Sequence, residues 1–335
     1  SYQARLDSLE QYDAGLPQQL NAAGRLQGVL QGDEISVDQL TMAMDEAPLE
    51  LALQAEVAGY TSASPVIVAD LQWRDARWPL TAEAPDFASD GGTLNFSGTV
   101  EDYRLAITAE LLGADIPASH WQIQGQGNLQ QLTLQALQGQ VLDGELRARG
   151  TLAWDPLLRW KLQIEGEGLD PGQVVEDLYG EMALSLTTQG LLDSAGDLQA
   201  SASVEQLTGT LLDYPLTLSA ELGIAGETLQ VEQLDLASGK NHLEMQGDAS
   251  ARALALNWKL DAPQPDVFLP EVSGYIRASG HLAGTPETPV LHMHLANSNI
   301  AFDSLSVPQI QADLIAGMGQ EDPLELSLSS CLLYT

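Results

Sequence analysis

The sequence predicts an all-β protein, an elongated and curled antiparallel sheet built from degenerate repeats. Three observations lead to this fold class. Apolar and polar residues alternate with a period of two, turn residues recur about every eight to twelve positions, and no long helical pattern separates the expected strands. Strands that follow one another without helical crossovers pair antiparallel. We therefore expect a meander rather than a parallel α/β sheet.

The first 30 residues follow a different pattern from the rest of the chain. Leu6, Leu9, Tyr12 and Leu16 recur at helical spacing, which places side chains on one face of a helix. We expect one or two short helices in residues 1–30. A continuous repetitive β-groove is expected over residues 31–330, and we interpret residues 331–335 as the truncated end of a longer protein.

From residue 31 onward the alternation favours strands. Residues 49–57, 160–164, 254–260 and 291–295 each carry an apolar residue at every second position, with mostly polar residues between. Successive side chains of a strand point to opposite faces of the sheet. These segments are therefore expected to form strands with one aliphatic face and one mostly polar face.

An internal repeat supports an array of similar strand units. Residues 132–150 align without a gap to residues 229–247, an offset of 97 positions. Each copy leads into a strand that contains a tryptophan, Trp160 or Trp258, and then into a break that contains proline. Degenerate repeats of this kind predict an extended array that grows by adding strand units.

Charge and cysteine content exclude several classes of protein. The chain has 335 residues, with 13 Lys and Arg against 47 Asp and Glu, a net charge of −34. Such a chain is repelled by nucleic-acid phosphates, and it lacks the basic residues that hold a protein flat on an anionic bilayer. Cys331 is the single cysteine, so no internal disulfide forms. We expect a monomer that binds no nucleic acid.

The apolar face of the expected sheet needs a cover. At about 25 cal/mol per Å² of apolar area, dozens of exposed leucines would cost tens of kcal/mol. A second sheet, a β-solenoid, or a trough filled by an apolar ligand would each provide that cover. The flexible, leucine-rich lining and the continuous acidic exterior favour the trough, although the residues alone leave all three open.

The sequence contains no strong catalytic signal. His292 and His294 share one strand face and could both reach a metal ion, but no Cys or third His lies nearby, and we interpret them as two exposed polar-face residues. No nucleophile-elbow, phosphate-loop or dinucleotide motif is present. The abundant carboxylates single out no acid–base pair. We expect no enzyme, no cofactor and no metal.

The tryptophans allow two interpretations. They could pack at sheet corners and under loops, or some could line an apolar groove. Trp160 and Trp258 are the best candidates for lining because both are in register with leucines on the apolar side of their strands.

Two segments resemble a known family. Residues 270–296 run as a glycine, an alternating strand, Gly284-Thr285 and a proline-led strand, and residues 146–172 are similar. This unit resembles the recurring unit of the TamB family, within the AsmA-like superfamily. The resemblance covers most of residues 28–330.

The resemblance implies a fold, a location and a function. It implies a curled sheet, a "β-taco", with an apolar groove along its length. It also implies a protein of the Gram-negative periplasm, anchored in the inner membrane by an N-terminal helix that is absent from this sequence. Its partners would be phospholipid acyl chains, carried toward the outer membrane. The outer-membrane barrel protein TamA would be a further partner in protein assembly, through a region outside this chain.

The leading hypothesis is thus a non-enzymatic lipid conduit. The alternatives are a dry-cored β-structure that acts as an adhesin, passenger or scaffold, and a polysaccharide-active β-helix enzyme. The residues expected to line the groove are the apolar positions of the two repeat copies and of the family-like stretch. They are Leu132, Leu134, Leu146, Trp160, Leu162, Ile164, Leu229, Val231, Leu243, Leu256, Trp258, Leu260, Leu291, Met293 and Leu295.

Overall fold

The computed structural model confirms an all-β protein built as an antiparallel meander. It describes residues 2–6, 9–10, 19–20, 22–44, 48–79, 85–113, 117–175, 179–193, 195–269, 271–302, 305–317 and 324–329. The chain divides into two compact units. The first comprises Ser1–Pro156 and Ile164–Tyr179, and the second comprises Leu157–Gln163 and Gly180–Thr335.

The first unit is a ladder of strands that, apart from the pair of β1 with β4, pair with their neighbours in sequence. Its strands are β1 (Tyr2–Leu6), β4 (Ala22–Gln31), β5 (Glu34–Met44), β6 (Glu50–Ala58), β7 (Val66–Trp78), β8 (Phe87–Gly98), β9 (Tyr103–Gly113), β10 (Ser119–Gly127), β11 (Gln131–Val141) and β12 (Gly144–Ala153). All of these pairs are antiparallel. A separate short pair joins β2 (Leu9–Glu10) and β3 (Gln19–Leu20).

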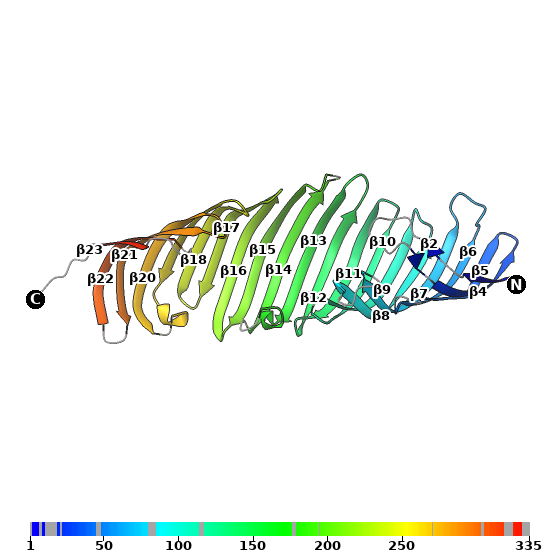
Figure 1. The fold of residues 1–335 in the computed structure, drawn as a ribbon, viewed down its shortest axis with the longest axis horizontal. Helices are drawn as coiled ribbons and strands as arrows, with labels where there is room; N and C mark the ends of the chain where they lie inside the picture. The colour runs from blue at the N-terminus through cyan, green and yellow to red at the C-terminus, as the bar shows by residue number, and fades with distance from the viewer. Residues whose placement is uncertain are drawn as a thin grey trace, which may run out of the picture. The chain divides into compact units, whose positions relative to one another are not determined.

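The second unit repeats this plan. Its strands are β14 (Gly180–Leu192), β15 (Leu198–Leu211), β16 (Tyr214–Ala225), β17 (Thr228–Ser238), β18 (Asn241–Ser250), β19 (Leu254–Ala262), β20 (Val272–Gly284), β21 (Pro289–Phe302), β22 (Leu305–Gly317) and β23 (Leu324–Ser329). Figure 1 shows β14, β15 and β16 side by side in green. Strand β13 (Leu158–Leu169) contributes residues to both units.

After each copy of the sequence repeat, the strand that contains the tryptophan is followed by a 3-10 helix, at the position where the prolines predict a break. The helix η1 (Pro171–Gln173) follows β13, and η2 (Pro265–Val267) follows β19. Each begins with a proline, whose fixed backbone angle suits the first helical position. No helix in the described part of the chain is long and apolar enough to cross a membrane.

The register places the apolar residues of each unit on one face, because directly opposed residues of an antiparallel pair share a face. The central row of the first unit runs through Leu26, Leu40, Leu53, Leu71, Leu94, Ile107, Ile123, Leu137 and Ala148. The central row of the second unit runs through Leu186, Val204, Ala220, Leu234, Met245, Trp258, Gly280, Met293 and Leu314. We call the side that carries these rows the apolar face of each unit.

β-Bulges shift the alternation within several strands. In β11 the bulge lies between Leu134 and Leu137, and in β17 it lies between Val231 and Leu234. These are equivalent positions of the two repeat copies. A bulge adds one residue to a strand, so apolar residues three apart return to the same face. The two repeat copies are therefore alike in local backbone geometry as well as in sequence.

The core is small and made mainly of alanine. The buried apolar residues of the described part are Ala88, Ala109, Leu134, Leu169, Ala220, Val231, Ala262, Ile276, Ala278 and Ala312. Strands pack chiefly against their neighbours in sequence, and no second sheet covers the apolar face of either unit within the described ranges. A single layer cannot enclose large side chains, so most leucines remain half-buried.

Two expectations were wrong. The predicted N-terminal helices are absent from the described residues: β1 pairs with β4, and Leu6 lies opposite Gly24. Pairing within the ladder gives β1 and β4 backbone hydrogen-bond partners, and this outweighs the helical spacing of the apolar residues. Tyr12 and Leu16 lie outside the described residues. The strong curl is also not seen within either unit. Each bulge bends its own strand, and within the described ranges the strands contact chiefly their neighbours in the ladder.

Candidate functional site

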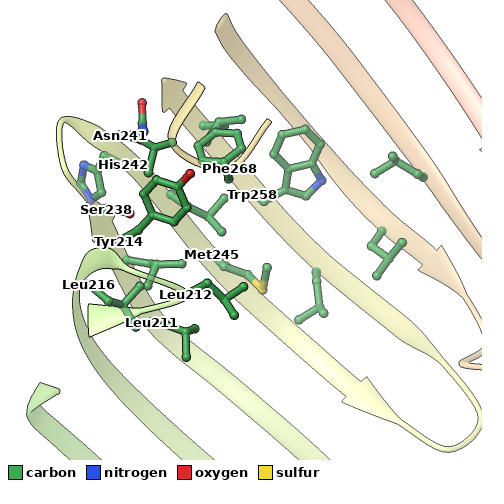
Figure 2. Close-up of a pocket in the computed structure, with 17 residues that line it drawn as sticks. Leu211, Leu212, Tyr214, Leu216, Ser238, Asn241, His242, Met245, Trp258 and Phe268 are labelled. Atoms are coloured by element: carbon green, nitrogen blue, oxygen red, sulfur yellow. The ribbon is translucent and has the colours of Figure 1, made fainter. Parts of the chain in front are cut away.

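An open apolar cavity lies in the second unit, on the apolar face of β15 to β21. Its volume is about 840 Å³, within the range of about 300–1,000 Å³ that small-molecule sites occupy. Figure 2 shows its lining side chains converging from these strands and from the segment that follows η2. The cavity is therefore formed by one sheet face and one short overhanging segment.

The floor of the cavity is aliphatic. The strand register brings together side chains from sequence positions up to 80 residues apart. These side chains share a face because they lie opposite one another in neighbouring strands. The apolar residues of the floor are Leu211, Leu216, Leu236, Leu243, Met245, Leu256, Trp258, Leu260, Leu282 and Leu291. Such a floor offers dispersion contacts and no fixed polar partner, which suits a flexible hydrocarbon.

The segment after β19 forms one wall of the cavity. The buried Asn241 side chain accepts a hydrogen bond from the Gln264 amide at 2.9 Å and donates one to the Gln264 carbonyl at 2.7 Å. Pro265 beside it is fully buried. These contacts fix the position of η2, so that Val267 and Phe268 border the cavity. Figure 2 shows the Phe268 ring near Tyr214.

One edge of the cavity is polar. Tyr214 and Ser238 line it at the ends of β16 and β17, on the face that carries the leucines. His242, at the end of β18, borders the same edge, but its side chain lies on the polar face, where its Nε2 atom is 3.5 Å from the Asp235 Oδ1 atom. Figure 2 shows Tyr214 and Ser238 at one end of the cavity, apart from Met245.

The register places the predicted lining residues of the second unit on its apolar face. Leu243 lies opposite Leu260, and Gly247 lies opposite Leu256. The cavity itself is bordered by Leu243, Leu256, Trp258, Leu260 and Leu291. Met293 and Leu295 pack instead against the buried cluster of Ala262, Ile276 and Ala278. Leu229 and Val231 lie farther along β17, outside the cavity.

The predicted residues of the first unit share its apolar face but border no apolar cavity. Leu132 lies opposite Leu152, Leu134 lies opposite Gly150, and Leu146 lies opposite Gly139. On β13 the alternation puts Trp160, Leu162 and Ile164 on one face, with Trp160 and Leu162 in the second unit and Ile164 in the first.

Burial divides the predicted residues into three groups. Leu134 and Val231, which occupy equivalent repeat positions, are 5% and 7% exposed and belong to the sheet's own packing. Leu229 is 38% exposed. The others are half-buried. Half-buried leucines on an uncovered face are the positions that a ligand could contact.

Sequence reasoning missed several residues around the cavity. Tyr214, Ser238 and Phe268 border it. Tyr214 begins β16 and Ser238 ends β17, and the alternation of apolar and polar residues is weak in both strands. Phe268 follows a proline break. Leu212 also borders it from a two-residue turn in which Leu212 and Asp213 have φ values of 51° and 67°.

His281, His292 and His294 lie on the polar face, and each meets a cross-strand neighbour. The His294 Nδ1 atom lies 2.6 Å from the Asp313 Oδ1 atom, and the His292 ring stacks on His281 with 4.1 Å between ring centroids. Elsewhere in the described ranges, ligand atoms of Asp235, His242 and Glu244 lie within 4.8 Å of one another on an exposed surface. Neither arrangement includes a buried polar ligand that would define a metal site.

The first unit has a cavity of different character. Its volume is about 850 Å³, and it is bordered by the carboxylates Asp90, Glu110, Asp143, Glu145 and Glu167. Arg147 donates to both Glu145 carboxylate oxygens, at 2.9 and 2.8 Å, and this pairing raises the pKa of Arg147 above its usual value. A cavity so acidic repels anions, unlike the leucine-lined cavity of the second unit.

The fold and the site together define a single-layer antiparallel β-ladder with an uncovered apolar face. The family described as "TamB, N-terminal domain" matches residues 15–329. The chain therefore belongs to the TamB family.

One relative extends this comparison. The translocation and assembly module subunit TamB of Haemophilus influenzae is 24% identical over 267 residues, which are 77% of this chain and 19% of the relative. The chain thus spans about a fifth of that relative's length. No solved structure matches the chain significantly.

Proposed function

We propose that this chain is part of a non-enzymatic bridge protein in the periplasm of a Gram-negative bacterium. In this proposal, the apolar faces form a groove over residues 31–330 that shields phospholipid acyl chains between the inner and outer membranes. The observation that carries the proposal is the mostly half-buried apolar row from β14 to β22 in the second unit, together with its open cavity.

Family membership supports the cellular role. The relative's name describes a subunit of a translocation and assembly module. We infer that the whole protein supports outer-membrane biogenesis and protein assembly together with TamA, through a region outside this chain. An N-terminal inner-membrane anchor outside this sequence belongs to the same proposal.

The proposal predicts that acyl chains contact Leu256 but not the neighbouring Ala255. Leu256 borders the cavity, whereas Ala255 is exposed and lies opposite Asp248 on the polar face. We would compare Leu256→Asp with Ala255→Asp, using a phospholipid that carries a photoactivatable group on one acyl chain. An ionised carboxylate repels hydrocarbon because desolvating the charge is costly.

The expected result is at least about tenfold less crosslinking for Leu256→Asp, equivalent to about 1.4 kcal/mol, and little change for Ala255→Asp. At an open groove the aspartate reaches water, so the melting temperature should change little. A folded parent protein that never crosslinks to lipid would contradict the conduit and favour a dry-cored scaffold. In that case Leu256→Asp should unfold the unit instead.

A further inference from the structure

Two large apolar side chains follow η2 with almost equal exposure, and only one of them faces the cavity. Phe268 is 44% exposed and Leu269 is 45% exposed. Phe268 borders the leucine-lined cavity, whereas Leu269 does not. Figure 2 shows the Phe268 ring among the other lining side chains. A hydrocarbon that covers this ring is favoured, because it removes apolar surface from water.

The wall that carries Phe268 is fixed to the sheet through Asn241. The buried Asn241 side chain bonds both the amide and the carbonyl of Gln264. The Phe268 and Leu269 amides in turn donate to the Pro265 carbonyl, at 3.2 and 2.8 Å. A short path of hydrogen bonds and chain therefore joins β18 to Phe268. A wall held in this way needs little further ordering when a ligand binds.

The first copy of the repeat does not build this wall. The gapless alignment pairs Asn241 with Gly144, and a Cβ atom on Gly144 would overlap the Glu167 carbonyl oxygen. In that copy the segment before η1 is tied instead by the Asp170 amide, which donates to the Leu142 carbonyl at 2.7 Å. The link from Asn241 to Gln264 is therefore particular to the second copy, and the repeat fold does not itself require it.

The cavity offers contacts to hydrocarbon but no charged partner to a head group. Among the described residues that border it, none is Asp, Glu, Lys or Arg. The His242 side chain lies on the polar face, together with Asp235 and Glu244. A charged head group inside the cavity would lose its hydration without gaining an opposite charge, which is costly. The cavity therefore suits an acyl chain whose head group stays in water.

We propose that the wall after η2 makes this part of the apolar face a retaining site for one lipid acyl chain, whatever the head group. Phe268 contacts the chain on one side and the leucine floor contacts it on the other, while Asn241 is a positioning residue. This inference rests on the proposed function and deepens it, because it names the part of the lipid that is recognised. The apolar face of the first unit, which borders no apolar cavity, lets the chain pass without retention.

The test locates an acyl chain along the protein. Phosphatidylethanolamine, phosphatidylglycerol and diacylglycerol would serve as probes, each with the same palmitoyl chains and a photoactivatable group near the end of one chain. Peptide mass spectrometry would compare crosslinking within residues 241–262, which contain β18 and β19, with crosslinking within residues 131–153, which contain β11 and β12. The ratio of the two yields measures retention and does not depend on how much lipid enters.

The matched variants are Phe268→Ala and Leu269→Ala. For the parent protein and for Leu269→Ala we expect a ratio of at least about 5, equivalent to about 1 kcal/mol. Phe268→Ala should lower the ratio toward one, because the contacts of the ring with the chain are lost. Equal ratios for the two variants, or a parent ratio near one, would overturn this inference and leave the conduit intact. If the folded parent crosslinks to lipid nowhere, the proposed function fails, and this inference fails with it.

Asn241→Ala tests the positioning role. It keeps the Phe268 ring but removes both bonds to Gln264, so it should lower the ratio as Phe268→Ala does. A variant that thermal melting shows to be folded and that keeps the parent ratio would show that Asn241 does not position the wall. The comparison of Phe268 with Leu269 does not depend on this variant.

The three probes test whether the head group matters. Because only the chain is recognised, their ratios should agree within about twofold, or about 0.4 kcal/mol. A larger preference for one head group would contradict a site that recognises the chain alone.

Discussion

Four indole rings each lie across a glycine of the neighbouring strand. The pairs are Trp73 with Gly92, Trp121 with Gly139, Trp160 with Gly190, and Trp258 with Gly280. Three of the indole nitrogens donate to a nearby hydroxyl: Trp73 to Ser89, Trp121 to Ser119, and Trp160 to Thr188. A side chain on any of these glycines would displace the ring. The tryptophans are thus part of the sheet's own packing, and Trp258 also borders the cavity.

The contact with Trp73 predicts opposite outcomes at two adjacent glycines. A Cβ atom on Gly92 would overlap the Trp73 ring and lie 2.6 Å from the Thr108 carbonyl oxygen, whereas one on Gly91 would meet only the Trp73 carbonyl at 3.7 Å. We expect Gly92→Ala to lower the free energy of unfolding by about 1–3 kcal/mol. Gly91→Ala should be neutral or slightly stabilising. Urea unfolding would measure both, and equal shifts would refute this account of the packing.

Asp33 gives a pH-dependent prediction. The Thr61 hydroxyl, at 2.6 Å, and the Thr61 amide, at 3.0 Å, both donate to the Asp33 carboxylate and lower its pKa below the ordinary value of 3.8. A lowered pKa stabilises the fold at pH values above the unfolded-state pKa. This stabilisation is lost as the pH falls through the folded-state pKa. Thr61→Val should raise the pKa of Asp33 toward 3.8 in an NMR titration. Ser62→Ala is the control and should leave that pKa unchanged.

At the scale of the strand, the bulges determine which residues share a face. In β11, Gln135 is the extra residue relative to both β10 and β12, since Leu134 and Ala136 lie opposite consecutive residues of β10. The equivalent extra residue of β17 is Glu232. Each bulge lets Leu134 or Val231 be buried while the following leucine returns to the apolar face.

This geometry predicts that one deletion is tolerated and another is not. Deleting Gln135 leaves one residue between Leu134 and Leu137, so both stay on the apolar face of a regular strand. Deleting Thr133 makes Leu132 and Leu134 adjacent, and one of them must face the polar side. We expect a loss of about 1.5–3 kcal/mol for each leucine so displaced, measured by urea unfolding. Equal losses for the two deletions would show that the bulge does not control the faces.

Alternation was sufficient to predict the strands and, for most of them, the apolar face. It placed Leu256, Trp258 and Leu260 together, and the register confirms that they lie in adjacent rows. It could not reveal the bulges, because an extra residue looks like an imperfect pattern. The wall of the cavity was equally hidden, since Asn241 and Gln264 are 23 positions apart and meet only after β18 and β19 have paired.

For the whole molecule, the net charge of −34 dominates the electrostatics. The ion pairs of the described residues are few and mostly exposed, such as Arg252 with Glu227, and such pairs stabilise little. Carboxylate repulsion therefore opposes folding. Because salt screens this repulsion, we expect the melting temperature to rise between about 10 mM and about 1 M salt, as the Debye length falls from about 30 Å to about 3 Å. A melting temperature that falls over this range would contradict this view.

The neighbour-only pairing of the strands also determines how the chain can fold. Apart from β1 with β4, each described pair in the two ladders joins strands that are consecutive in the sequence. The mean sequence separation of contacting residues is therefore short, which favours fast folding. Each completed strand presents an unpaired backbone edge on which the next strand can dock. The protein can thus fold one strand at a time, starting with the N-terminal strands, while the chain is being synthesised.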